Sequence, residues 1–570
     1  MQSSGFLILL LLKIVVTQET LEPKNLYEDY QNWRISQNPL VAYYLGYDDS
    51  VSAEVNDYSL AGLTQRYETA KNYSAQASNL LKNNQSIEDQ RFLKMIQFEC
   101  GTYMKSYELQ GYLLPPVTFK NGVQVTLPAF FNSPQNFKWD TNMDFERNLK
   151  ILRGLPKMIR QIQRLLEEGV KEKMTFAKVS IQGTIEKLKS LQDDMKNPPF
   201  FSQFERNILY RKTALEIIEK AVLPAFKVSL NYTIFPDTKK RSFFLFFCNF
   251  TLRVHKKKFY ATPLFTRCFQ DLEVFLSTTY LDSTRKGNGV SSMEKFNGEN
   301  DVYYNALLEY STTLTNVNAS EFYDYGYAQL EKSQKRLVEL THQLGILASA
   351  NHTVKEAIEA MYNSPSMYFQ TPQEILDNFQ TELENIKDRL PRIFEPQILT
   401  DSVYQVTPHP MSKGRLGIAY FSKASSDGRR PGAFYVNMHN LKAITKNIVA
   451  TITLHEATPG HHMQDAILTA EAQLPKFVTQ FVDLPGDLPS SMPSYMYVAY
   501  KEGWGLYSEY LGYDLGIYQN EPMKELGYIK GDLLRSARLV VDVGLHKYGW
   551  TRQKAIEFLM DNTGFSPGYF

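Results

Sequence analysis

Apolar residues recur at three- and four-residue intervals through most of the chain. The pattern runs from Leu26 to about Leu113, resumes at about Phe145, and returns from Ser320 to about Leu390. Such spacing is typical of amphipathic helices that pack on one side, so these segments are interpreted as core helices. The pattern predicts a fold that is mainly α.

Polar and proline signals predict where some of these helices begin and where one breaks. Ser86 with Asp89 is a variant of a capping box. Thr371-Pro372-Gln373-Glu374 combines a cap, an early proline and a glutamate at the third position. Pro156, which follows Gly154 near the start of the second helical region, predicts a break or a new first turn there.

Two short segments have the composition of β-strands instead. Leu416 to Phe421 and Ala433 to Asn437 lie on either side of the turn Asp427-Gly428, which predicts two strands. The next segment places four residues along one helical face: Ile444, Ile448, Ile452 and His455. We therefore expect a small edge β-sheet beside this helix, and we expect the helix to follow an edge strand.

Residues 228–267 differ from the helical segments around them. They contain the aromatic run Phe243 to Phe247, the cluster Lys256-Lys257-Lys258 and a single acidic residue. A β-rich insert and an anionic-surface patch are two interpretations, although the stretch is too short and interrupted to span a bilayer. We favour a translated intron, because Ala225-Phe226-Lys227 would continue into Phe269-Gln270-Asp271-Leu272 as one amphipathic helix.

Composition is that of an ordinary globular protein. The 570 residues are enough for one large enzyme fold or for about two to four average domains. Hydrophobic residues make up 43% and charged residues 22% of the chain. The 62 basic and 61 acidic residues leave a net charge of +1, so nothing proposes nucleic acid as a partner.

The N-terminus resembles a secretory signal peptide. The apolar run from Phe6 to Val16 is shorter than the about 20 residues that a transmembrane anchor needs, so we predict a cleaved signal over 1–20 and no stable membrane span. Three cysteines allow at most one bridge, for example Cys248 to Cys268. Six N-x-S/T sequons agree with an extracellular or lumenal location: Asn72, Asn84, Asn231, Asn249, Asn318 and Asn351.

The strongest chemical signal is a cluster of histidines in the last fifth of the chain. His455, His461 and His462 fall within eight residues, with Glu456 beside the first. Imidazoles and a carboxylate this close together suit Zn²⁺, and Glu456 would be free to act as a general base. In a regular helix the later histidines would lie about 9 to 10 Å beyond the first, too far for one ion. The helix must therefore bend, and Pro459-Gly460 is where it can.

A second motif supplies a third ligand by resemblance. Glu502-Gly503 resembles the N-E-G segment of thermolysin-like and aminopeptidase-type zinc peptidases, in which that glutamate binds zinc. Both motifs, with Arg538 to His546 and Trp550, resemble the family catalogued as domain of unknown function 885. Tyr27 to Leu45 and Tyr303-Tyr304 extend the resemblance over most of the chain. The family implies a large helical, zincin-like metallopeptidase fold.

The resemblance also implies roles for single residues. His455 matches the first zinc ligand, Glu456 the general base and Glu502 the third ligand. His461 is the preferred second ligand. His462 is either its rival or a hydrogen-bond donor to the oxyanion.

Polar residues on the following helices are further candidates. Glu509, seven residues after the third ligand, is expected to support a ligand rather than to be one. Arg535, Arg538, Asp542 and His546 form a polar stripe that is either a buried salt-bridge network or a substrate-binding surface. In the second case, Arg538 or His546 would bind a peptide carboxylate or the oxyanion.

We therefore expect a secreted or lumenal zinc hydrolase that cleaves peptide bonds with zinc-activated water and Glu456 as the base. Its partner would be a peptide or small amide substrate. Residues 21–400 and 401–570 would form one continuous catalytic domain. One alternative is an inactive or incomplete homologue, since family members usually continue beyond Phe570. Another is a zinc hydrolase of a non-peptide amide or ester, and the oligomeric state stays open.

Overall fold

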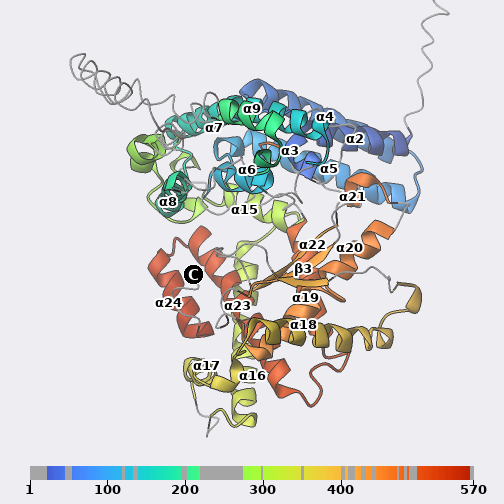
Figure 1. Cartoon of the computed structure of the whole chain (residues 1–570), viewed down its shortest axis with the longest axis vertical. Coiled ribbons are helices and arrows are strands. Elements are labelled where there is room, and N and C mark those ends of the chain that lie inside the picture. The colour runs from blue at the N-terminus through green and yellow to red at the C-terminus, as the bar shows by residue number, and fades with distance from the viewer. Residues whose placement is uncertain are drawn as a thin grey trace, which may run out of the picture.

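The computed structural model describes most of the chain (Figure 1). The described residues are 22–44, 54–118, 122–132, 139–193, 202–218, 272, 274–296, 300–347, 352–398, 405–408, 418–424, 432–438, 441, 444–470, 474–479, 484–486 and 497–564. The predicted signal peptide, the 228–267 segment and the Asp427-Gly428 turn lie outside them. Within the described residues the fold is mainly helical with a small sheet, as predicted, and no helix is long and apolar enough to cross a membrane.

The N-terminal helices confirm the helical pattern predicted from Leu26 to Leu113. Ser86 caps the fourth of them, because its hydroxyl accepts a hydrogen bond from the backbone N–H of Asp89. α4 and α5 pair side by side, and α2 packs against α4. The elements are α2 (Pro23–Gln37), α3 (Pro39–Tyr44), α4 (Leu60–Leu81), α5 (Ile87–Glu108) and η1 (Gly111–Leu113).

The break expected at Pro156 is wrong, because α7 continues through this proline from Asn142 to Lys171. Leu152, Leu155 and Ile159 are all buried around it, so packing on both sides outweighs the one backbone hydrogen bond that proline cannot donate. The neighbouring elements are α6 (Val123–Asn132), α8 (Lys178–Asp193), η2 (Phe204–Arg206), α9 (Ile208–Ile217), η4 (Leu276–Tyr280), η5 (Leu281–Ser283), η6 (Val290–Ser292) and η7 (Glu294–Phe296).

The helical region predicted from Ser320 to Leu390 is confirmed. Thr371 caps α18 as expected, with Pro372 in the first turn and the N–H of Glu374 bound to the threonine hydroxyl. The elements are α15 (Asn300–Thr312), α16 (Ala319–Gln343), α17 (Val354–Tyr362), η8 (Pro365–Met367), α18 (Pro372–Lys387), η9 (Leu390–Arg392) and η10 (Pro396–Ile398).

The sheet has the two expected strands and a third that the sequence did not reveal. β2 (Ala419–Ser422) and β3 (Ala433–Val436) are antiparallel, and β1 (Gln405–Pro408) pairs with β3 in parallel. The order is β1-β3-β2. The prediction that the helix after these strands follows an edge strand is therefore wrong, because β3, the strand before it, is the central one. The edge strands are β1 and β2.

The remaining helices carry the candidate site. They are η12 (Lys446–Ile448), α19 (Val449–Glu456), α20 (His461–Ala470), α21 (Lys476–Thr479), α22 (Val498–Tyr510), α23 (Pro522–His546) and α24 (Arg552–Thr563). Figure 1 shows α2 to α9 in the upper part of the view and α16 to α20, the sheet, α23 and α24 in the lower part, with α22 between α5 and α19.

Candidate metal centre

The histidine motif lies on both sides of a helix break. α19 ends at Glu456 and α20 begins at His461. Glycine is required in the turn, because a Cβ on Gly460 would lie 1.8 Å from the carbonyl oxygen of His455. The bend predicted at Pro459-Gly460 is confirmed.

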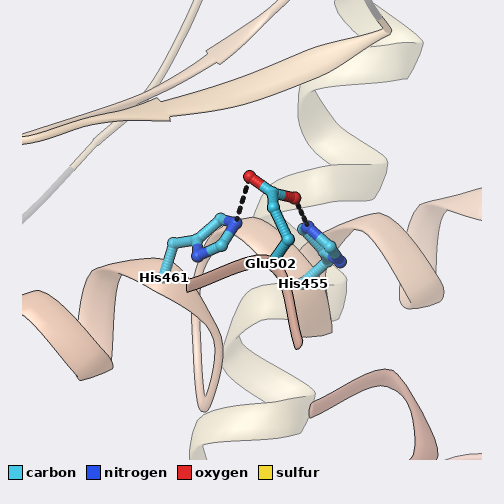
Figure 2. A group of neighbouring side chains, drawn as sticks. All are labelled: His455, His461 and Glu502. Atoms are coloured by element: carbon cyan, nitrogen blue, oxygen red, sulfur yellow. Dashed lines mark ion pairs between the residues drawn. The ribbon is translucent and has the colours of Figure 1, made fainter. Parts of the chain in front are cut away.

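The bend brings two histidines to one glutamate of α22 (Figure 2). Nε2 of His455 lies 3.5 Å from Oε2 of Glu502, and Nε2 of His461 lies 3.8 Å from Oε1 of the same side chain. The two imidazole rings are almost perpendicular, with centroids 4.7 Å apart. One donor atom from each residue lies within 4.8 Å of the other two. The three predicted ligands thus converge on one point.

The cluster is open on one side. The side chains of His455 and His461 are 9% and 15% exposed, whereas that of Glu502 is 62% exposed. Two imidazole nitrogens and a carboxylate oxygen are the donor set of many catalytic zinc sites, in which water takes the remaining position. The chemistry and openness of these residues fit a Zn²⁺ ion with one accessible coordination position.

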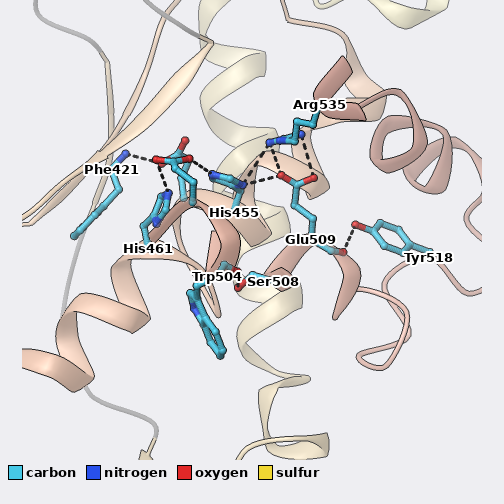
Figure 3. Close-up of polar contacts among 10 residues, drawn as sticks. Phe421, His455, His461, Trp504, Ser508, Glu509, Tyr518 and Arg535 are labelled. Carbon is cyan, nitrogen blue, oxygen red and sulfur yellow. Dashed lines mark hydrogen bonds and ion pairs between the residues drawn. The ribbon is translucent and has the colours of Figure 1, made fainter. Parts of the chain in front are cut away.

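A buried ion pair supports the cluster from behind (Figure 3). Oε1 of Glu509 lies 2.7 Å from Nδ1 of His455, and the Glu509 side chain is fully buried. Nη2 of Arg535 donates to the same oxygen at 2.6 Å. A carboxylate that accepts the Nδ1 proton leaves Nε2 of the ring free to bind a metal and fixes the ring orientation. Glu509 therefore lies behind a ligand, while Glu502 faces the open side.

The charges of the cluster depend on one another. Burial lowers the pKa of His455, but hydrogen bonds with Glu502 and Glu509 outweigh burial and raise this pKa to about 9. Hydrogen bonds from His455 and His461 hold the pKa of Glu502 well below its usual range. Near neutral pH the metal-free His455 is therefore protonated on both ring nitrogens. A metal ion that binds at Nε2 would have to displace the proton there.

α22 approaches the histidine turn closely. The indole N–H of Trp504 donates to the carbonyl oxygen of Pro459 at 2.8 Å. A Cβ on Gly505 would lie 2.7 Å from Cε1 and Nε2 of His455. Only a residue without a side chain lets the helix backbone lie this near the ring. Gly505 is thus part of what places Glu502 over the two histidines.

The predicted general base is tied to the edge strand. The backbone N–H of Phe421 on β2 donates to Oε2 of Glu456 at 2.8 Å. Burial raises the pKa of Glu456, an effect that the nearby His455 and His461 oppose. A carboxylate with a raised pKa is better suited to taking up a proton and passing it on.

Sequence comparison places the chain in a family. The model of bacterial proteins of unknown function (DUF885) matches residues 39–234 and 255–569. The chain belongs to this family. The interruption of the match falls inside the 228–267 segment. No curated protein matches this DUF885 chain.

Two solved structures resemble the DUF885 chain. A protein from Colwellia psychrerythraea, provisionally described as a lipoprotein, matches with a TM-score of 0.74 and 23% identity, over 96% of this chain and 87% of that one. A protein of unknown function from Shewanella oneidensis, also provisionally described as a lipoprotein, matches with a TM-score of 0.52 and 15% identity over the same shares of the two chains. At these identities the likeness shows the fold alone.

In this DUF885 chain His462 lies apart from the three-residue group. It is buried, and its ring packs edge-on against Phe421 with centroids 5.4 Å apart. Burial, with a smaller effect of Lys387, lowers its pKa to about 4. The geometry thus favours His461 over His462 as the second ligand.

The polar stripe of α23 has three different environments. Arg535 contacts Glu509 at the cluster. Arg538 is exposed and makes no ion pair with the residues that the structure describes. His546 lies eleven residues beyond Arg535, about 16 Å along the helix, and its Nδ1 accepts a hydrogen bond from the N–H of Val290.

The far end of the stripe is held by an aromatic residue. The hydroxyl of Tyr304 donates to Asp542 at 2.8 Å, and its ring stacks on that of His546. Neither alternative predicted for the stripe describes all of it, because Arg535 belongs to a partly buried ion pair while Arg538 faces solvent. His546 is not among the residues that converge at Glu502.

Proposed function

We propose that this protein is a zinc-dependent hydrolase that cleaves peptide bonds. The observation that carries the proposal is the convergence of His455, His461 and Glu502 within 4.8 Å, with Glu502 open to solvent. Glu456, the residue after the first proposed ligand, supplies a half-buried carboxylate beside them.

Each residue has a distinct role in this proposal. His455, His461 and Glu502 would hold Zn²⁺, which when bound would polarise both a water molecule and the scissile carbonyl. Glu456 would accept the proton of the attacking water and deliver it to the leaving amine. The N–H of Phe421 keeps the Glu456 carboxylate oriented. Arg538, exposed one turn beyond Arg535, is the cation proposed to attract a substrate carboxylate.

The openness of the cluster favours catalysis over a structural role for the metal. Structural zinc sites are usually closed by four protein ligands, often cysteines. Among the described residues the group contains three ligands, and the one cysteine they include, Cys100, is buried in the core of the N-terminal helices. An accessible fourth position is what an incoming water or substrate requires.

We place this activity in the secretory pathway, in the lumen or outside the cell. The apolar N-terminal run supports this location. Three of the sequon asparagines, Asn72, Asn84 and Asn318, are exposed, as glycan acceptors must be. The two similar solved structures are provisionally described as lipoproteins, which also suits a protein outside the cytoplasm.

The test is a comparison of wild type with Glu456→Gln. We expect the variant to keep its zinc content, because it retains all three ligands, and to lose hydrolysis of a mixed peptide library by at least about a hundredfold. His461→Ala, assayed beside it, should lose both zinc and hydrolysis. Undiminished turnover by Glu456→Gln would exclude this residue as the base. Hydrolysis of esters but not of peptides by wild type would reassign the substrate class.

A further inference from the structure

A second glutamate, far from the metal centre in sequence, is hydrogen-bonded by side chains of α2 and by the residue before α22. Glu99 on α5 is buried, and its Oε2 accepts hydrogen bonds from the hydroxyl of Tyr30 at 2.7 Å and from Nη1 of Arg34 at 3.0 Å. Both partners lie on α2. Its other oxygen, Oε1, accepts a hydrogen bond from the hydroxyl of Tyr497 at 2.5 Å.

Tyr497 is the residue immediately before α22. One carboxylate therefore joins the N-terminal helices to the start of the helix that carries Glu502. α22 also packs against α19, so it runs from the bond at Glu99 to the histidine motif (Figure 1).

α5 also holds the chain before α22 at two other points. The hydroxyl of Tyr103 donates to the carbonyl oxygen of Pro485 at 3.2 Å, and the hydroxyl of Ser106 donates to that of Gly486 at 3.0 Å. Earlier in the same connection, Phe477 of α21 is buried among the aromatic rings of Tyr27 and Tyr30. The N-terminal helices thus hold Phe477, Pro485 and Gly486 as well as Tyr497.

The first turn and a half of α22 is exposed. Residues 499–503 are all exposed, Glu502 among them. The later part is held by buried contacts, in which Glu509 binds His455 and Arg535. The start of the helix has few buried side chains of its own, and a hydrogen bond to a fully buried carboxylate is strong in such surroundings.

We propose that Tyr497 is a positioning residue for the third metal ligand. Through its bond to Glu99 it holds the start of α22, and so sets where Glu502 lies relative to His455 and His461. Two ligands are placed by the helices next to the sheet, and the third is placed by the N-terminal helices. The inference rests on the proposed metal centre and adds a role for the N-terminal half of the chain in building it.

The test uses two substitutions that remove the same kind of bond from the same carboxylate. Tyr497→Phe removes the hydroxyl that ties α22 to Glu99, and Tyr30→Phe removes one that ties α2 to it. We expect Tyr497→Phe to lower Zn²⁺ affinity by about tenfold, the lower end of the range for residues that orient metal ligands. Tyr30→Phe should change it by less than about twofold, although it costs at least as much folding stability, because the Tyr30 hydroxyl also accepts a hydrogen bond from Nη1 of Arg34 at 2.8 Å.

The readouts are a Zn²⁺ competition titration, the visible spectrum of the Co²⁺-loaded protein, and unfolding of the metal-free protein. A changed Co²⁺ spectrum in Tyr497→Phe but not in Tyr30→Phe is expected, because only the first moves a ligand. Equal Zn²⁺ affinities in the two variants would overturn the inference while leaving the metal centre intact. Absence of Zn²⁺ binding by wild type would instead remove the proposed function.

Discussion

Glu502 and Glu509 lie on one helix, seven residues apart, and face the two nitrogens of one imidazole ring. Glu502 approaches Nε2 of His455 to 3.5 Å with a side chain that is 62% exposed. Glu509 approaches Nδ1 to 2.7 Å with a side chain that is fully buried. One glutamate thus approaches His455 from the solvent-exposed side of the ring, and the other approaches it from the buried side.

The difference in burial separates two tasks. Glu509 is bound by His455 and by Arg535, so its charge is balanced inside the protein. Glu502 contacts two histidines at the long distances of 3.5 and 3.8 Å, and the rest of its side chain is exposed to solvent. A buried charge is retained only if it is paired, whereas an exposed one is available to a ligand from solvent. This difference supports the proposal in which Glu502 is a metal ligand, while Glu509 stabilises the ring position of His455.

The largest expected effect comes from Glu502→Ala. Loss of a ligand should lower Zn²⁺ affinity by more than about a hundredfold, beyond the ten- to hundredfold cost of losing a residue that only orients a ligand. The unfolding free energy of the metal-free protein should fall by only about 1 kcal/mol, because the pairing of Glu502 with the two histidines is weakened by its exposure. A competition titration and urea unfolding in chelator measure the two effects.

Asp514→Ala is the matched control for Glu502→Ala, since Asp514 is an exposed carboxylate beyond the end of the same helix. Its Zn²⁺ affinity should equal that of wild type. If Glu502→Ala also bound Zn²⁺ with wild-type affinity, Glu502 would not be a metal ligand. The two glutamates of α22 would then differ in burial but not in the proposed function.

The same substitution at Glu509 should reverse the order of the effects. Glu509→Ala leaves Arg535 and His455 without their carboxylate, and breaking a buried pair costs about 3–5 kcal/mol. The side chain of Arg535 is 35% exposed and retains some hydration, so we expect a loss of about 2–3 kcal/mol in the unfolding free energy of the metal-free protein. Equal urea midpoints for the Glu502 and Glu509 variants would show that burial does not divide their roles.

The sequence predicted which three residues converge more completely than it predicted the contacts behind them. His455, His461 and Glu502 come from two short motifs, and Pro459-Gly460 between the histidines indicates the bend, because neither residue suits the middle of a regular helix. The pairing of Glu509 with Arg535 joins two helices, and such a contact cannot be read from the spacing within either one. Arg535 was therefore expected only as a member of a stripe.

The fold shows the same limit. Helices with a clear apolar periodicity were predicted correctly, because the pattern itself reports which side is buried. Pro156 was misjudged because buried neighbours on both sides, known only from tertiary structure, keep α7 continuous. β1 has four residues and pairs with β3 from a distant position, so its sequence carries no strand signal of its own. Because β1 was not predicted, β3 was expected to pair on one side only and so to be an edge strand.

The smallest effect that still tests the comparison comes from two glycines of α22. A Cβ on Gly505 would lie 2.7 Å from the ring of His455, whereas one on Gly503 would meet nothing within 4 Å. Gly505→Ala should lower the unfolding free energy by about 1–3 kcal/mol, the usual cost of overpacking, and weaken Zn²⁺ binding because the ring or the helix must move. Gly503→Ala should gain up to about 1 kcal/mol from helix propensity and leave Zn²⁺ affinity unchanged.

Urea unfolding and Zn²⁺ titration of the two alanine variants give the answer. Glu509 contacts Nδ1 of His455, so the ring cannot move away from the added methyl group without disturbing that contact. Wild-type Zn²⁺ affinity in a folded Gly505→Ala would mean that α22 can shift away from His455 while Glu502 still reaches both histidines. The position of the third ligand would then depend on the flexibility of its long side chain rather than on the close packing of α22 against His455.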